Sequence, residues 1–176
     1  GEYDVSGEWT GRFVISVDDT QRVKLVLKGL TAECSYDSVI YCECADKLII
    51  KNQKGYINTI KDTDTRGKAA IYSRASIDFS GAGTLYVSSD YKHAVSTTKK
   101  LTVENGTIIA NSADCGLKGN NSLVIEAGNV TIQSNGDAIK TEETEDTEKG
   151  YVDILGGEVT IVTTGDGISA TRICNI

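Results

Sequence analysis

The sequence predicts an all-β fold, a parallel β-helix of about six coils, from three observations. Short runs rich in Val, Ile and Thr alternate apolar and polar residues and show no helical period. These runs return at intervals of roughly 20 to 30 residues, with glycine turns between them. The chain contains 18 Gly and no Pro, as expected for stacked strands that are hydrogen-bonded along both edges.

Each predicted coil consists of an apolar strand, a glycine turn, a second strand, and a turn that leads into a short aliphatic segment. Such a unit leaves no room for a crossover helix, so that each coil must stack directly on the previous one. Along the chain, we expect the coils in segments 22–41, 47–73, 76–96, 100–119, 122–141 and 151–170.

The alternation within each strand predicts which side chains face a common interior. Leu101 and Val103 would face inward, whereas Thr102 would face the other way. The spacing from Leu117 to Ile139 is 22 residues, and the next interval is longer because an acidic segment, 141–150, is inserted. A β-sandwich is the competing fold, but it predicts hairpin turns rather than the same side chain returning at the same place.

Alignment of the coils predicts two columns of stacked residues. One column precedes the aligned aliphatic residue by two positions and contains Ser38, Ala69, His93, Cys115, Asp137 and Asp166. The other follows it by one position, faces solvent and contains Tyr41, Tyr72, Ser96, Lys118, Lys140 and Ser169.

The composition limits the classes of partner. Lys and Arg number 18 against 25 Asp and Glu, a net charge of −7, so we expect no nucleic-acid partner and favour a divalent cation. No apolar stretch approaches the roughly 20 residues of a membrane span, and we expect no membrane insertion. The length predicts one domain over residues 1–176, and the absence of Met suggests an excised piece or repeat unit of a longer chain.

The cysteines do not predict a zinc site, because the chain has no CxxC pair and only one His. They can be buried small hydrophobic residues or disulfide partners, and the sequence leaves the pairing of Cys34, Cys42, Cys44, Cys115 and Cys174 open. It also leaves open whether the N-x-S/T sequons at Asn105, Asn120 and Asn129 carry glycans.

Several segments resemble a family of bacterial β-helix proteins described as carbohydrate-binding domain proteins, whose shape is similar to that of pectate lyases. These are "GEYDVSGEW", "KLVLKGL", "GAGTLYV", "DCGLKG", "GDAIKT" and "GYVDILGGEVTI" followed by "GDGISA". The resemblance implies a right-handed, extracellular or cell-surface β-helix that binds Ca²⁺ and a polysaccharide such as cellulose or polygalacturonate. The chain departs from the family pattern at Cys115, where the family more usually repeats an acid.

The recurring acidic turn has two interpretations. Asp114, Asp137 and Asp166 can cap their turns by accepting hydrogen bonds from backbone N–H groups, as Asp does beside Gly. Alternatively, carboxylates stacked on adjacent coils can share a Ca²⁺ ion, which accepts six to eight oxygen ligands in irregular geometry. We therefore name Asp137, Asp166 and Asp114 as candidate metal ligands.

The solvent-facing column supplies a candidate sugar surface in Tyr41, Tyr72, Lys118 and Lys140. Aromatic rings can pack on sugar C–H groups, and lysine can pair with uronate carboxylates. The same residues are also ordinary outward residues of a strand. No combination of nucleophile, base and orienting group is evident.

These observations favour an extracellular, non-catalytic, calcium-dependent polysaccharide-binding module. A calcium-dependent lyase is one alternative, with Lys118 or Lys140 as the base, although neighbouring acids would raise the pKa of these lysines. A structural subunit that associates head to tail into a filament is the other, because unpaired strand edges at the ends of a β-helix can pair with another copy.

Overall fold

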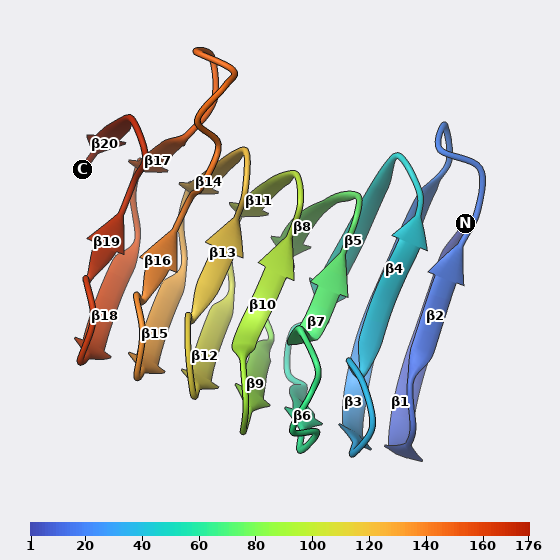
Figure 1. Cartoon of the computed structure of the whole chain (residues 1–176). Coiled ribbons are helices and arrows are strands. Elements are labelled where there is room, and N and C mark those ends of the chain that lie inside the picture. The colour runs from blue at the N-terminus through green and yellow to red at the C-terminus, as the bar shows by residue number, and fades with distance from the viewer.

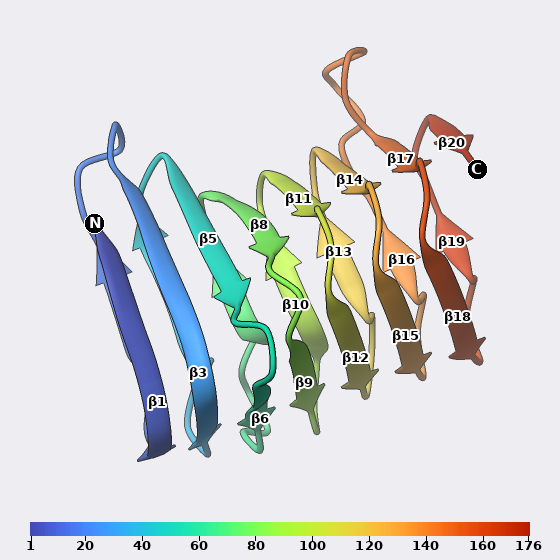
Figure 2. The ribbon, with the colours of Figure 1, turned by 180° about the vertical axis from the view of Figure 1, so that it is seen from behind.

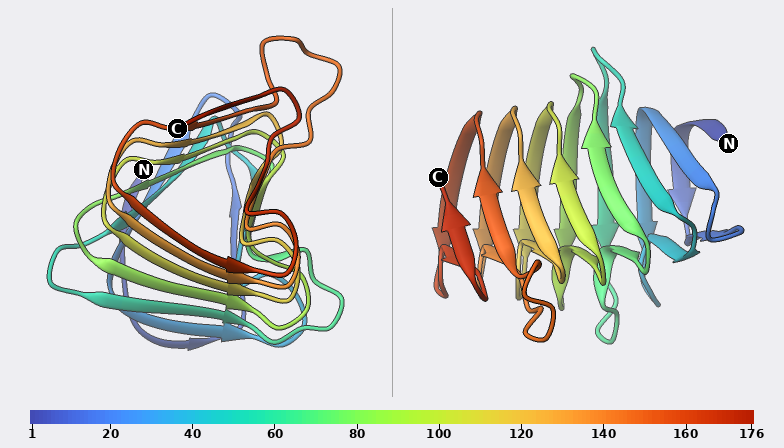
Figure 3. Two further views of the ribbon diagram at one scale, coloured as in Figure 1. Left: turned by 90° about the vertical axis from the view of Figure 1, so that its left-hand side faces the viewer. Right: turned by 90° about the horizontal axis from the view of Figure 1, so that it is seen from above.

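A computed structural model describes residues 1–176 and contains twenty strands and no helix. The strands form a stack of coils in which each strand pairs in parallel with the equivalent strands of the neighbouring coils (Figure 1). Viewed along the stack, the coils enclose a roughly triangular cross-section (Figure 3). The predicted parallel β-helix is confirmed.

Two sides of the triangle belong to one thirteen-stranded sheet, seen from behind in Figure 2. Two long strands, β1 (Glu2–Thr10) and β3 (Arg22–Cys34), contribute to both sides. One side continues with β5 (Lys47–Asn52), β8 (Ser76–Ser80), β11 (Lys100–Val103), β14 (Ser122–Ile125), β17 (Tyr151–Ile154) and β20 (Ile173–Asn175). The other continues with β6 (Ile57–Asp62), β9 (Thr84–Ser89), β12 (Thr107–Ser112), β15 (Asn129–Ser134) and β18 (Glu158–Thr163).

The third side is a seven-stranded sheet at the front of Figure 1. Its members are β2 (Phe13–Ser16), β4 (Ile40–Cys44), β7 (Ala69–Ser73), β10 (His93–Thr97), β13 (Leu117–Gly119), β16 (Ile139–Lys140) and β19 (Ile168–Ser169). Because these strands are short and in register, equivalent side chains of successive coils stand next to one another.

The chain forms seven coils, one more than the six predicted, because β1 and β2 make an additional first coil. In β1, Tyr3, Val5 and Trp9 alternate with polar residues, but only Gly11 and Arg12 separate β1 from β2, so this coil lacks the recurring acidic turn on which the other coils align. The pairing register of β1 with β3 shifts between Val5 and Gly7, where β3 contains one extra residue. The six predicted segments each correspond to one of the remaining coils.

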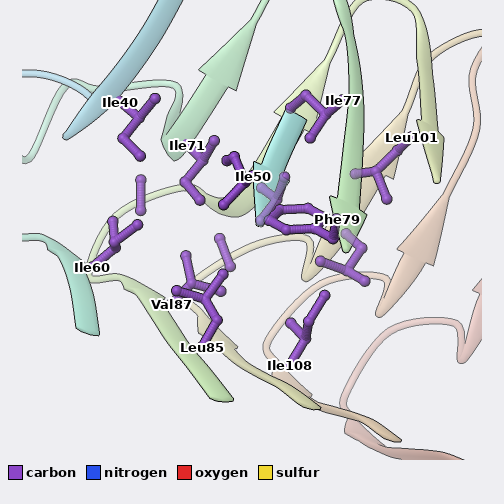
Figure 4. Close-up of a cluster of buried hydrophobic side chains, with 14 of the residues drawn as sticks. Ile40, Ile50, Ile60, Ile71, Ile77, Phe79, Leu85, Val87, Leu101 and Ile108 are labelled. Atoms are coloured by element: carbon purple, nitrogen blue, oxygen red, sulfur yellow. The ribbon is translucent and has the colours of Figure 1, made fainter. Parts of the chain in front are cut away.

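The core fills the interior of the triangle with aliphatic side chains and one fully buried aromatic residue, Phe79 (Figure 4). Leu101 and Val103 are buried as predicted, and they stack on Ile77 and Phe79 of the preceding coil. The column of aligned aliphatic residues is also confirmed and comprises Ile40, Ile71, Val95, Leu117, Ile139 and Ile168.

All five cysteines are free thiols, and Cys34, Cys42 and Cys115 are buried as small hydrophobic residues. No helix is present that would be long and apolar enough to cross a membrane. The acidic segment 141–150 projects from the stack as a loop, drawn in orange in Figure 3. The first residues of this loop lie beside the seven-stranded sheet, where Glu142 contacts Lys118 of β13.

Candidate functional site

The predicted solvent-facing column forms a ladder of adjacent side chains on the outer side of the seven-stranded sheet. Tyr41 pairs with Tyr72, Tyr72 with Ser96, Ser96 with Lys118, and Lys118 with Lys140. Neighbouring strands lie about 4.8 Å apart, so the ladder presents one side chain at each such step along the stack. We call this surface, defined by the five residues above, the ladder face.

The first two members of the ladder face are stacked tyrosines. Their ring centroids are 5.8 Å apart and the ring planes are inclined by 13°. The Arg12 guanidinium lies 5.0 Å from the Tyr41 ring centroid, and the Lys68 ammonium lies 4.7 Å from that of Tyr72. Both distances are typical of cation–π contacts, which hold the rings in place and leave a partly apolar surface.

A depression of about 400 Å³ lies over this tyrosine pair, and we call it the tyrosine depression. Arg12 is fixed at its edge by an ion pair with Asp37, with 2.5 Å between nitrogen and oxygen. The other lining residues are Tyr36, Tyr41, Asp64, Arg66, Gly67, Lys68 and Tyr72. The depression thus combines aromatic rings with hydrogen-bonding groups of both charges, a combination typical of sugar sites.

A second depression, of about 240 Å³, adjoins the first and shares Gly67, Lys68 and Tyr72 with it. We call it the lysine depression, because Lys68, Lys92 and Lys118 line it and no carboxylate does. Its remaining lining residues are His93, Ser96, Thr97, Thr98 and Asn120. The two depressions together form a groove across successive coils, parallel to the axis of the stack.

The loop 63–68 that carries Arg66 and Lys68 is anchored by two buried carboxylates. Asp62 accepts hydrogen bonds from the backbone N–H of Asp64, at 2.8 Å, and from the Ser89 hydroxyl, at 3.0 Å. Asp64 in turn accepts a bond of 2.8 Å from the backbone N–H of Thr65. Burial raises the pKa of Asp62, and the nearby carboxylates of Asp64 and Asp37 add to this effect.

The far end of the ladder face is occupied by ion pairs. Glu142, from the acidic loop, contacts Lys118 at 2.5 Å and Lys140 at 3.4 Å, and Lys140 also contacts Asp137 at 3.2 Å. Burial acts to lower the pKa of Lys140, but its hydrogen bonds with Asp137 and Glu142 outweigh burial and raise it. Lys140 is therefore held as a cation.

The three candidate metal ligands do not converge on one point. Asp137 accepts a hydrogen bond of 3.0 Å from the backbone N–H of Asp166 on the next coil, which supports a structural role for the recurring turn. Asp114 instead pairs with Lys92, at 2.6 Å, and Asp166 is exposed. No group of three or more His, Cys, Asp or Glu side chains is arranged to hold a metal ion.

His93 lies beside Asp114 but is a neutral residue of the groove wall. Its Nδ1 accepts a hydrogen bond of 3.3 Å from the backbone N–H of Cys115, which assigns the ring proton to Nε2. Burial lowers its pKa to about 4, more strongly than the Asp114 carboxylate raises it. Cys115 replaces the recurring acid and, being buried, has its pKa raised to about 12.

A family model of carbohydrate-binding domain-containing proteins matches residues 1–176. The chain belongs to this family. A member from Acetivibrio thermocellus, described as a carbohydrate-binding domain-containing protein, is 33% identical over 186 residues, which cover 100% of this chain and 65% of the relative. This chain thus spans less than two thirds of that relative's length.

A solved structure has the same fold. It is described as the polysaccharide lyase-like protein from C. thermocellum, in a gadolinium derivative, and matches with a TM-score of 0.91 at 28% identity. The match covers 99% of this chain and 84% of the other. This carbohydrate-binding family member thus has a polysaccharide lyase-like β-helix, as its sequence predicted.

The structure places Tyr41, Tyr72, Lys118 and Lys140 on one face, as the repeat spacing predicted, but two further cations of the groove, Arg12 and Lys68, were not predicted. Arg12 lies in the first coil, which was not predicted, and Lys68 lies in the loop between β6 and β7, outside the repeating strand pattern. One signal was available: Ile40 and Ile71 are 31 residues apart, whereas Ile71 and Val95 are only 24 apart. The longer interval indicates inserted residues, three of which lie in the loop 63–68, since this loop has six residues and the equivalent loop of the next coil, 90–92, has three.

Proposed function

We propose that this protein is a non-catalytic polysaccharide-binding module that holds its ligand in the groove of the ladder face. The observation that carries the proposal is the stacked pair Tyr41 and Tyr72 at the base of a groove lined by cations and hydroxyls. Sugar rings offer C–H faces to aromatic rings and hydroxyls to polar neighbours, and both kinds of surface are present here.

The direction of the groove favours a polymer over a single sugar. Each coil adds one side chain to the ladder at intervals of about 4.8 Å, so an extended glycan along the stack would contact several coils in turn. Each contact is weak, but contacts along one chain act together. We propose an acidic glycan such as polygalacturonate for this groove, because Lys68 and Lys118 can pair with carboxylates.

A second surface suits a neutral glycan such as cellulose. The outer sides of β9, β12 and β15 form a continuous array without a charged residue. It comprises Thr84, Tyr86 and Ser88, then Thr107, Ile109 and Asn111, then Asn129, Thr131 and Gln133. Flat, uncharged strands with one exposed tyrosine offer stacking and hydrogen bonds without the cost of burying a charge.

We propose that the protein binds its polysaccharide without cleaving it. A lysine that removes a proton from a uronate must be neutral, whereas Lys140 has a raised pKa and is held between Asp137 and Glu142. We expect the protein to be retained by polygalacturonate or cellulose and to release no unsaturated product from polygalacturonate with calcium, as followed by ultraviolet absorbance. Steady release of that product would contradict the proposal and favour a lyase.

Calcium dependence stays a prediction of the family resemblance. The carboxylates fit a preformed calcium site poorly, since Asp114 and Asp137 are paired with Lys92 and Lys140. If Asp137 and Asp166 hold the ion, calcium at a hundredfold excess over its Kd stabilises the fold by about 2.7 kcal/mol. Chelator would then lower the melting temperature of the wild type.

The double variant Asp137→Asn and Asp166→Asn, compared with the wild type, tests the calcium prediction. It removes both charges but keeps a side-chain oxygen that can accept the Asp166 backbone N–H. Under the calcium prediction, the variant no longer responds to chelator. A wild type whose melting temperature is unchanged after its calcium is removed, as verified by elemental analysis, would support the capping role alone.

We propose that the protein acts outside the cell or on its surface, where such polysaccharides would be bound. Head-to-tail association stays a separate prediction, for which filaments in electron micrographs of the purified protein are the measurement.

A further inference from the structure

The lysine depression collects positive charge on a protein that is acidic as a whole. Lys68, Lys92 and Lys118 come from three successive coils and line the same hollow of about 240 Å³, into which no carboxylate projects. The whole chain carries a net charge of −7. A site of this kind attracts an anion locally, although the distant field of the protein repels it.

These lysines keep hydrogen-bond donors for a ligand. An ammonium group carries three donors, and Lys92 and Lys118 are each paired with a single carboxylate, Asp114 and Glu142 respectively. Lys68 has no ion-pair partner and lies over the Tyr72 ring. Two partly occupied ammonium groups and one free ammonium group therefore surround the hollow.

Neutral donors complete the hollow. Ser96 is only 5% exposed and lines the depression, and its hydroxyl makes no hydrogen bond within the chain. His93 also lines it, and the bond from Cys115 to Nδ1 leaves the Nε2–H as the donor of the ring. Because the Ser96 hydroxyl has no partner within the chain and lines the depression, it is available to donate a hydrogen bond to a ligand there.

The ion pairs at the far end of the ladder face show that lysines of this surface bind a carboxylate. Glu142 places a carboxylate between Lys118 and Lys140, at 2.5 and 3.4 Å. This internal carboxylate occupies the position next to the lysine depression and holds Lys140 away from a ligand. The open part of the basic surface is consequently the part around Lys68.

We infer that the lysine depression is the anion subsite of the groove, which binds a carboxylate or sulfate group of an acidic polysaccharide between Lys68, Lys92 and Lys118. The inference rests on the proposed function, because it takes the rest of the glycan to lie over Tyr41 and Tyr72. Glu142 competes with the ligand for Lys118.

The experiment measures the affinity of three oligosaccharides by calorimetry: a galacturonate hexamer, a sulfated glucan hexamer and neutral cellohexaose. Lys68→Gln is expected to weaken binding of the anionic oligosaccharides about 3- to 10-fold and to leave cellohexaose unaffected. Glu142→Gln is expected to tighten anionic binding about 3-fold, because Lys118 gains a free donor. The tighter of the two anionic ligands identifies carboxylate or sulfate as the preferred group.

Lys54→Gln is the matched control, since Lys54 is exposed, forms no ion pair and lies away from the groove. Equal affinity losses in Lys68→Gln and Lys54→Gln would overturn the inference, as would an equal effect of Lys68→Gln on cellohexaose. If only cellohexaose binds, the proposed polysaccharide-binding function stands and the anion subsite is wrong, whether the sugar lies in the groove or on the uncharged array. If none of the three oligosaccharides binds the wild type, both are wrong.

Discussion

Replacing Gly128 by alanine is expected to lower the free energy of unfolding by about 3 kcal/mol. Gly128 has a φ of +97°, a conformation that costs a residue with a Cβ about 1 kcal/mol. A Cβ at this position would also lie 2.4 Å from the carbonyl oxygen of Gly106 on the preceding coil. Overpacking against backbone, which cannot rotate away, adds on the order of 2 kcal/mol.

The matched control for this prediction is Gly55→Ala. Gly55 has a similar φ of +84°, but a Cβ there would meet no atom within 4 Å. Only the conformational cost of about 1 kcal/mol should remain. Urea unfolding of both variants separates the conformational cost from the steric cost. Equal destabilisation of the two variants would show that close stacking of the glycine corners is not what stabilises the coils.

The double variant Tyr41→Ala and Tyr72→Ala is expected to weaken glycan binding in the groove by about 30-fold. Truncation of a central aromatic contact typically costs about 1 kcal/mol or more, and two such losses of about 2 kcal/mol in total correspond to this factor. The rings face outward and stack on each other, so the change removes ligand surface without opening the core.

Two controls accompany this measurement. Tyr72→Phe keeps the ring and is expected to retain most of the affinity, whereas Tyr86→Ala removes an exposed tyrosine from the uncharged array on the other sheet. Melting temperatures confirm that each variant is folded. An affinity for galacturonate oligomers that survives the double variant would show that the groove is not their site.

The fold could be predicted because the aliphatic column repeats along the chain. Ile71, Val95 and Leu117 return at nearly constant spacing, and a parallel stack brings equal positions together without further information. The first coil was not predicted because only Gly11 and Arg12 separate its two strands, so that the recurring acidic turn, on which the other coils were aligned, is absent. The aligned residue of this coil is also aromatic, Phe13, where the later coils have an aliphatic residue.

The candidate site could be predicted only in part for a related reason. The residue spacing predicts that Tyr41 lies beside Tyr72, because both lie on strands, where the position of a residue determines the face to which its side chain points. Loops have no such period, so that Lys68 over Tyr72 and Glu142 between two lysines could not be inferred from spacing. The metal prediction stays a prediction: the alignment put Asp137 beside Asp166 and indicated acids near Lys140, but it could not show that Asp137 itself pairs with Lys140.

A crystal structure of the protein with a galacturonate hexamer tests the central claim most directly. We expect sugar rings over Tyr41 and Tyr72, a chain direction along the coil stack, and one carboxylate between Lys68 and Lys118. A hexamer bound to the uncharged outer side of β9, β12 and β15, or at any site away from the ladder face, would contradict it.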